Sequence, residues 1–268
     1  MSGSERDLTT GQVFRTWWPL AASWVLMALE GPLQTIFVAR LADPKIHLAA
    51  FGSLVLPIAM LIEAPIIMLL SASTALCVDH DAYRKIRRFM HGLSAALTVL
   101  HIVIALSPLY HLLVVNVLHA PPEIVEPGRI GFILMIPWTW AIAYRRFNQG
   151  VLIRFGRSLS VGVGTLIRLC ANGIVLTVGF TLIEVPGTTL AALAIMAGVL
   201  SEAAYVGLCV RPVLRDRLPQ VSDVQPLTYR AFLRFYVPLS LTSLILMGIR
   251  PVLSAAVGRM PNALDSLA

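Results

Sequence analysis

Ionisable side chains stand inside long apolar runs of this 268-residue sequence, at Glu30, Glu63, Arg168, Glu202 and Arg250. An ionised side chain at the centre of a bilayer costs about 2.5–3.5 kcal/mol on insertion scales, so such residues occur where they pair or face a cavity. A carboxylate in a cavity can bind a cation or exchange a proton, and an arginine can neutralise that carboxylate or receive an anion. The chemistry that these residues indicate is ion binding within a membrane.

Glu30 is the first candidate for an ion-coupling residue. Gly31 and Pro32 follow it directly, and they loosen the helical backbone where a carboxylate could meet a proton or a cation. Gln34 lies one turn further along and could add a neutral ligand, with a plain helix–helix hydrogen bond as an equal alternative. A buried structural ion pair is the competing interpretation of Glu30.

Further candidates lie in other apolar runs. Glu63 precedes Pro65 by two residues and repeats the combination of an acid and a proline. Arg168 and Asn172 are four residues apart and share one face of a helix, so Arg168 could neutralise Glu30 or Glu63 while Asn172 offers an amide ligand. A purely structural ion pair is the alternative for Arg168.

Two charged residues occupy the later apolar runs. Glu202 is expected to be structural and to be reached by side chains from the region of Arg211. Arg250 precedes Pro251, and we expect it either to close a gate with Glu30 or to receive an anionic substrate.

No catalytic or metal site is predicted. The histidines include no HExxH pattern, the three cysteines form no CxxC pair, and the segment Ser160–Thr165 lacks the lysine of a phosphate-binding loop. We therefore expect no enzymatic activity and no cofactor other than a proton or sodium gradient as the energy source.

Composition indicates a protein whose solvent is the bilayer. Hydrophobic residues make up 57% and charged residues 13% of the chain, and the mean hydropathy is +0.79, whereas soluble domains carry about 25% charged residues. The net charge is +7, but the basic residues form short clusters between apolar runs, which is typical of topology signals and not of a nucleic-acid surface. The polar N-terminus lacks the features of a cleaved signal peptide. We expect a multi-pass protein of the inner or plasma membrane.

Seven apolar stretches are long enough to cross a bilayer. They cover residues 17–39, 48–77, 89–115, 129–147, 159–183, 188–210 and 232–258. The second stretch contains Pro57 and Pro65, so we expect it to be one kinked helix.

Most of the 21 lysines and arginines fall on one side of this topology. These residues form three clusters, at 84–88, 145–157 and 211–234. Each cluster is separated from the next by two spans, so we expect all three to lie in cytoplasmic segments. The positive-inside rule then places the N-terminus in the cytoplasm and the loop 119–127 outside.

The seventh span resembles the first. When residues 14–42 are laid over residues 233–261, prolines and arginines coincide: Arg15 with Arg234, Pro19 with Pro238, Pro32 with Pro251 and Arg40 with Arg259. The alternative is a shared membrane-entry pattern. If the repeat is real, both copies run in the same direction, as in a parallel repeat. We then expect a cytoplasmic segment 1–16, a six-helix lobe 17–210, a basic linker 211–231, and the first helix of a second lobe at 232–268, in a truncated chain.

A six-helix lobe repeated in parallel resembles the MATE-type exporters of the multidrug/oligosaccharidyl-lipid/polysaccharide (MOP) superfamily. Three stretches are most similar to the progressive ankylosis (ANK)-like branch: Arg40–Pro44, Arg146–Ser158 and Arg250–Arg259. The resemblance implies alternating access between two lobes, coupled to protons or sodium ions, with the second lobe in cis or in a second copy. MATE proteins carry an acid on the first helix, which corresponds to Glu30 by helix and depth.

The resulting prediction is a secondary active transporter that exports small molecules by ion-coupled antiport. An ANK-like exporter of small anions or a flippase of lipid-linked precursors is the alternative within transporters. A membrane scaffold or a membrane-embedded enzyme would be different classes of protein. The scaffold predicts that the intramembrane charges can be replaced by apolar residues without penalty.

Overall fold

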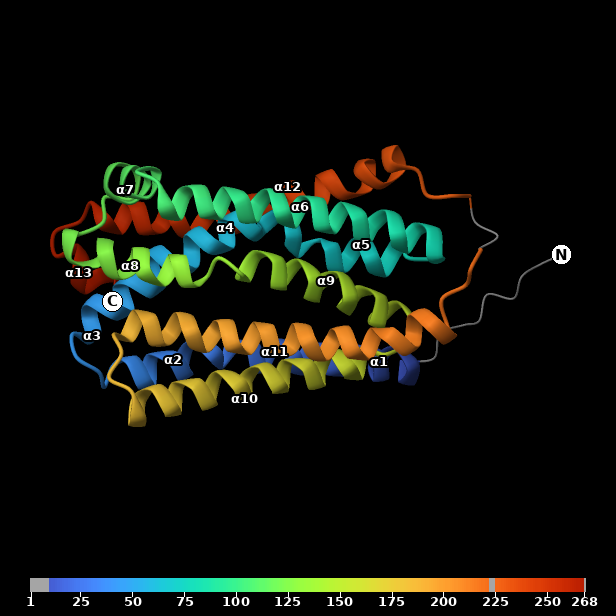
Figure 1. The fold of residues 1–268 in the computed structure, drawn as a ribbon, viewed down its shortest axis with the longest axis horizontal. Helices are drawn as coiled ribbons and strands as arrows, with labels where there is room; N and C mark the ends of the chain where they lie inside the picture. The colour runs from blue at the N-terminus through green and yellow to red at the C-terminus, as the bar shows by residue number, and fades with distance from the viewer. Residues whose placement is uncertain (1–9, 222–224, 268) are drawn as a thin grey trace.

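The structure is a computed structural model that describes residues 10–221 and 225–267, and these residues form a bundle of helices without strands (Figure 1). In chain order the elements are α1 (Thr10–Ala28), α2 (Glu30–Val38), α3 (Pro44–Ala49), the π-helix η1 (Ala50–Val55), α4 (Leu56–Ile67), α5 (Leu69–Leu76), α6 (His80–Leu106), α7 (Leu109–His111), the π-helix η2 (Leu112–Val117), α8 (Pro122–Leu134), α9 (Trp138–Arg154), α10 (Ser158–Leu182), α11 (Gly187–Asp216), α12 (Tyr229–Gly258) and α13 (Ala263–Leu267).

Six helical stretches within the described residues are long and apolar enough to cross a membrane. They are Trp17–Val38, Pro44–Leu76, His80–Leu106, Ser158–Leu182, Gly187–Asp216 and Tyr229–Gly258. The helices α8 and α9 lie end to end and make one further crossing of the bundle, and successive crossings alternate in direction (Figure 1). The chain is therefore a multi-pass integral membrane protein, and the predicted all-α membrane fold is confirmed.

The first crossing is two helices, where the sequence predicted one continuous span from 17 to 39. The helix α1 ends at Ala28, Leu29 forms a turn, and α2 begins at Glu30. Pro32 has no backbone N–H to donate to the carbonyl of Ala28, which is the physical reason for the break. The helix α1 begins at Thr10, inside the predicted cytoplasmic segment, and residues 1–9 lie outside the described residues.

The second crossing is one kinked span, as predicted. It contains the π-helix η1, and α4 gives way to α5 at Met68, three residues after Pro65. Pro65 cannot extend the helical hydrogen-bond ladder, and its own carbonyl accepts a hydrogen bond from the Tyr236 hydroxyl on α12. The kink therefore also holds α12 against this crossing.

The third crossing begins earlier than predicted. The helix α6 starts at His80, so the basic cluster 84–88 is helical and not a loop. The Asp79 side chain caps this helix by accepting a hydrogen bond from the Ala82 backbone N–H at 2.8 Å, which explains the early start.

The segment 119–127, predicted to be an external loop, is a loop only up to Pro121, because α8 begins at Pro122; its place outside the membrane stays a prediction. Proline is well tolerated in the first turn of a helix, where its missing N–H has no partner to lose. The linker predicted at 211–231 starts later than expected, since α11 continues to Asp216, and residues 222–224 lie outside the described residues.

The fourth predicted span, 129–147, is wrong as a single helix. The helices α8 and α9 are separated by the turn Met135–Pro137, and α9 continues to Arg154. Arg145 and the neighbouring Arg146 consequently lie inside the bundle and not in the predicted cytoplasmic loop. Arg145 is only 2% exposed, because a buried carboxylate neutralises it, as described below.

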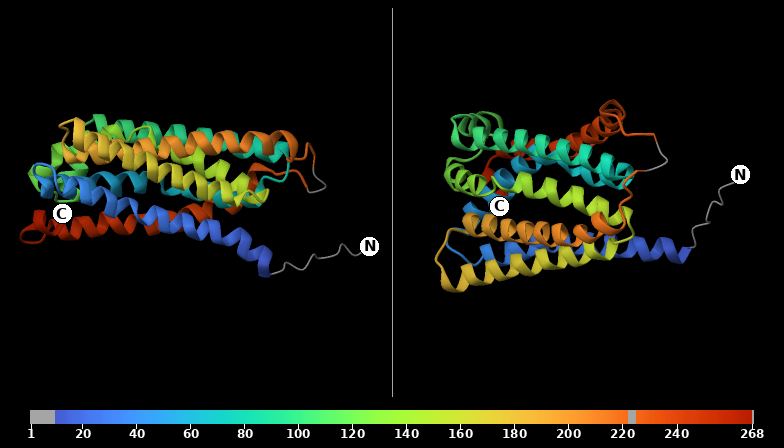
Figure 2. Two further views of the ribbon diagram at one scale, coloured as in Figure 1. Left: turned by 90° about the horizontal axis from the view of Figure 1, so that it is seen from below. Right: turned by 45° about the vertical axis from the view of Figure 1, so that its right-hand side comes forward.

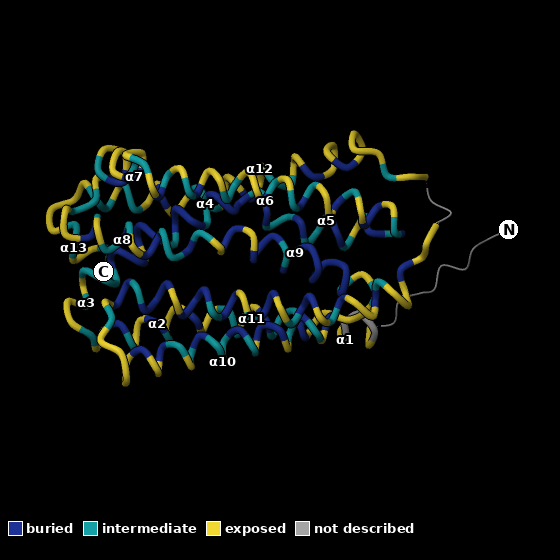
Figure 3. Tube along the Cα trace, in the orientation of Figure 1, coloured by how far each residue is buried: buried dark blue, intermediate teal, exposed yellow. Residues whose placement is uncertain are grey.

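The most buried crossings lie at the centre of the bundle. Figure 3 shows α9 and α11 as largely buried, whereas the outer face of α10 is exposed. Small residues permit the close approach of α10 and α11: a Cβ at Gly198 would lie 2.9 Å from the carbonyl oxygen of Arg168.

The last crossing, α12, runs in the same direction as α1 and α2, and it packs on α4 (Figure 1). The helix α1 diverges from the rest of the bundle toward its N-terminal end (Figure 2). This arrangement leaves room between α1–α2, α4 and α12.

Candidate functional site

Glu30 occupies the first turn of α2, immediately after the break in the first crossing. The residue is 6% exposed, and its carboxylate lies near the N-terminus of a helix, where negative charge is favourable. The Thr35 hydroxyl donates to the Gly31 carbonyl at 3.0 Å within the same helix. The break therefore places a carboxylate in the interior of the bundle at a point where the backbone is irregular.

Arg168 on α10 holds the Glu30 carboxylate with both arms of its guanidinium group. Nε donates to Oε1 and Nη2 to Oε2, each at 2.5 Å. The third nitrogen, Nη1, lies 3.7 Å from Oε2 of Glu202 on α11. The guanidinium carbon also lies 5.9 Å from the ring centre of Trp138. Arg168 thus connects two carboxylates and prefers Glu30.

Glu202 is completely buried and is the centre of a second cluster. It accepts hydrogen bonds from Arg145 Nη1 at 2.5 Å, from Gln149 Nε2 at 2.9 Å and from the Thr165 hydroxyl at 3.4 Å. Arg145 and Gln149 lie one turn apart on α9, and Thr165 lies on α10. The predicted structural role of Glu202 agrees with this arrangement, but its partners come from α9 and α10 and not from the region of Arg211.

Glu63 on α4 faces the same group of arginines. It is 3% exposed, and its Oε2 atom has no hydrogen-bond partner among the described residues. The side chains that act on its charge are Arg145, Arg146, Trp138 and Arg168. Unlike Glu30 and Glu202, it forms no ion pair with a described residue.

Glu30, Glu63 and Arg168 line a cavity of about 350 Å³ between the first crossing, α4, α9, α10, α11 and α12, whereas Glu202 does not reach its wall. Two carboxylates and four guanidinium groups contribute to its wall: Glu30, Glu63, Arg145, Arg146, Arg168 and Arg250. Arg146 and Arg250 form no ion pair with any described residue. Cationic groups therefore outnumber anionic groups on the wall.

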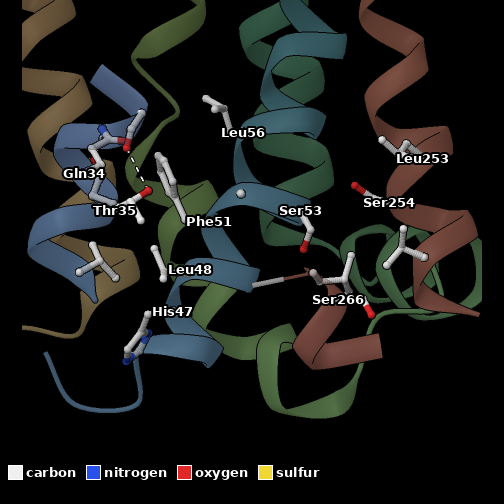
Figure 4. Close-up of a pocket in the computed structure, with 16 residues that line it drawn as sticks. Gln34, Thr35, His47, Leu48, Phe51, Ser53, Leu56, Leu253, Ser254 and Ser266 are labelled. Carbon is white, nitrogen blue, oxygen red and sulfur yellow. Dashed lines mark hydrogen bonds between the residues drawn. The ribbon is translucent and has the colours of Figure 1, made fainter. Parts of the chain in front are cut away.

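Two neighbouring cavities share lining residues with this one. A cavity of about 340 Å³ lies toward α3 and α13 and shares Gly31, Gln34 and Leu56 with it. Figure 4 shows side chains of Gln34, Thr35 and His47 on one wall and Ser254 on the other. A third cavity, of about 240 Å³, shares Trp24, Met27, Ile67 and Arg146 and lies toward α5. The three cavities form a row along the first crossing.

Five of the six residues selected from the sequence line the central cavity: Glu30, Gln34, Glu63, Arg168 and Arg250. Gln34 is buried, and its amide donates to the Ala191 carbonyl at 3.5 Å. Asn172 is not part of the cavity wall; it is fully buried on α10, and its Nδ2 and Oδ1 atoms have no partner among the described residues. No gating contact joins Arg250 to Glu30 here, since Arg168 holds that carboxylate.

Sequence reasoning missed Arg145 and Arg146 as cavity residues. The rule that gathers basic residues on the cytoplasmic side assigned them to the connection at the end of the span 129–147. Arg145 and Gln149 are four residues apart and share a helical face, which was the available signal for a polar pairing face on α9. Within the described residues, no group of three or more His, Cys, Asp or Glu side chains is placed to hold a metal ion.

Comparison with solved structures relates this fold to a transporter family. An inward-facing multidrug resistance MATE family transporter of the MOP superfamily matches 89% of this chain and 55% of its own chain, with a TM-score of 0.63 and 16% identity. An outward-facing structure of such a transporter matches 92% and 62% of the two chains, with a TM-score of 0.64 and 16% identity.

A third solved structure is a MOP superfamily transporter from Pyrococcus furiosus, described as having a binding pocket of reverse polarity that suggests a different function. It matches 92% of this chain and 62% of its own, with a TM-score of 0.61 and 16% identity. No family model and no curated protein matches the chain in sequence. The chain spans between about 55% and 62% of the length of these three structures, and over that length it has the fold of MATE family transporters.

Proposed function

We propose that this chain is a MATE-type secondary active transporter that moves small molecules across a membrane by alternating access, driven by a proton or sodium gradient. The observation that carries the proposal is the buried pair of Glu30 and Arg168 on the wall of an intramembrane cavity, at a break in the first crossing. The shared fold supports it. The proposal includes a cytoplasmic N-terminus and a second lobe, in cis or from a second copy, as the opposite half of the transport path.

The geometry suggests how an ion could be coupled to a change of contacts. A proton or a sodium ion that binds Glu30 competes with Arg168 for the same two carboxylate oxygens. Arg168 then has a second acceptor within reach, because its Nη1 already lies 3.7 Å from Glu202. Binding of the ion would shift the arginine from α2 toward α11, where it would share the Glu202 carboxylate with Arg145.

The test is ion-coupled transport by the purified full chain in proteoliposomes. Glu30→Gln should abolish substrate movement driven by an imposed proton or sodium gradient. Glu184→Gln removes the same charge from an exposed position between α10 and α11 and should transport like the wild type. If Glu30→Gln retains gradient-driven transport, Glu30 is not the coupling residue.

Small anions are the second candidate for the substrate class, in place of cationic drugs. Four arginines against two carboxylates line the central cavity, and Arg146 and Arg250 have no ion-pair partner among the described residues. A counterflow assay that compares citrate or pyrophosphate with ethidium distinguishes anionic from cationic substrates. Transport of ethidium alone would exclude the anionic class.

A further inference from the structure

A separate cavity of about 230 Å³ lies between α6, α9 and α11, and it shares no lining residue with the three cavities along the first crossing. It lies in the half of the bundle where α6 begins and α11 ends, which is also the end at which α1 begins (Figure 1). Its polar lining comprises Arg87 on α6, Arg211 on α11, the tyrosines Tyr83 and Tyr144, and Asn148. Among the described residues, no carboxylate lines it.

The two arginines of this cavity are not neutralised within the described residues. The acids nearest to them in sequence are already paired: Asp81 with Lys85 at 2.7 Å and Asp216 with Arg215 at 2.7 Å. Arg87 and Arg211 are exposed and form no ion pair with a described residue. Two guanidinium groups on one cavity provide the flat, multiple donors that suit phosphate oxygens.

The tyrosines add hydrogen-bonding capacity at fixed positions. The Tyr83 ring packs on Phe147 with ring centres 5.2 Å apart, and the Tyr144 ring stacks on Trp140 with ring centres 5.3 Å apart. Neither tyrosine hydroxyl is hydrogen-bonded to a described residue. A Cβ at Gly207 would lie 2.5 Å from the Tyr144 hydroxyl, so the glycine gives this hydroxyl room against α11.

The remaining wall of the cavity is apolar. It is formed by Met90 on α6, Phe147 on α9, and Gly207, Val210 and Leu214 on α11. An apolar wall makes no favourable contact with a free phosphate ion, whereas a phospholipid presents methylene groups directly beside its phosphate. Basic pockets between membrane helices on the cytoplasmic side are suited to anionic lipid headgroups.

We propose that this cavity binds the phosphate of an anionic membrane phospholipid. Arg87 and Arg211 hold the phosphate oxygens, the hydroxyls of Tyr83 and Tyr144 supply further donors, and the apolar wall contacts the glycerol and the first acyl methylenes. The lipid thereby joins α6, α9 and α11, including the helix that carries Arg145. The proposal does not depend on the transport function.

The test measures binding of water-soluble short-chain phosphatidylglycerol to the detergent-purified full chain, with short-chain phosphatidylcholine and inorganic phosphate as the other two probes. The double variant Arg87→Gln/Arg211→Gln should weaken binding of the phosphatidylglycerol roughly thirtyfold, since each basic side chain contributes about one kcal/mol at an anionic lipid surface. The control Arg84→Gln/Arg88→Gln removes the same charge from the same end of α6, outside the cavity, and should change affinity less than about twofold.

Equal loss in both double variants, or equal affinity for phosphatidylcholine, would overturn the site. Competition by inorganic phosphate at the same concentration as the lipid would assign the cavity to soluble phosphate and reject the lipid. Gly207→Ala provides a variant of unchanged charge: its Cβ displaces only the end of the Tyr144 side chain, so the thermal unfolding temperature should hold while binding falls. Unchanged binding in this variant, together with unchanged binding in Arg87→Gln/Arg211→Gln, would contradict the proposal.

Discussion

Arg168 and Glu30, which are 138 residues apart in the chain, form a bidentate ion pair with both N–O distances at 2.5 Å. The pair joins α10 to the first residue of α2, at the only position where the first crossing is broken within the described residues. Both side chains are buried, and in this pair each neutralises the charge of the other. Removing one partner should therefore cost more than removing both.

A double-mutant cycle tests this directly. Glu30→Gln and Arg168→Gln should each lower the thermal unfolding temperature of the purified protein, and the double variant should recover part of the loss. We expect a coupling energy of about 1–3 kcal/mol, because the residues are in direct contact. Additive losses would mean that the two side chains do not act as a pair.

Glu202 should be the most sensitive acid for stability. Glu202→Gln leaves Arg145 as a buried cation without its partner and weakens the contacts of Gln149 and Thr165, which predicts a loss of about 3–5 kcal/mol. Glu184→Gln, on the exposed segment after α10, should change stability by less than about 0.5 kcal/mol. Thermal unfolding followed by tryptophan fluorescence in detergent measures both, and similar behaviour of the two variants would refute the assignment.

The outcome for Glu202 shows what the sequence could and could not predict. Apolar length and composition were sufficient for the membrane fold, and rare intramembrane charges pointed to Glu30, Glu63, Arg168 and Arg250, which line one cavity. Those arguments depend on local sequence alone. The pairing of charges depends on which helices pack together, which local sequence does not encode.

The arginines of α9 illustrate this limit. The predicted fourth span ends at residue 147, and Arg145 and Arg146 were assigned to the cytoplasmic connection after it, because an arginine costs free energy in a bilayer when it is considered alone. The carboxylate that offsets this cost, Glu202, is 57 residues away and comes close only when α9 packs on α11. The break at Met135–Pro137, by contrast, had a local signal in Pro137 that the span assignment did not use.

The contact between α9 and α5 provides a test of packing that is independent of charge. A Cβ at Gly150 would overlap Ser73 and the carbonyl of Leu70, whereas a Cβ at Gly92 on α6 has no neighbour within 4 Å. Gly150→Ala should destabilise the protein by about 1–3 kcal/mol through overpacking. Gly92→Ala should be neutral or stabilise by up to about 1 kcal/mol, because alanine favours the helix. Equal unfolding temperatures for the two variants would show that α9 does not approach α5 as closely as described.

Substitution of Arg250 tests whether the part of the cavity wall formed by α12 takes part in transport. It lines the central cavity and forms no ion pair with a described residue, so its charge is available to a substrate or to a gate that closes in another state. Arg250→Gln should keep the unfolding temperature of the wild type and abolish transport in the proteoliposome assay with citrate and ethidium as probes. Arg230→Gln removes the same charge near the start of the same helix, at an exposed position outside the cavity, and should leave both properties unchanged. Wild-type transport by Arg250→Gln would show that this guanidinium neither receives the substrate nor closes the path.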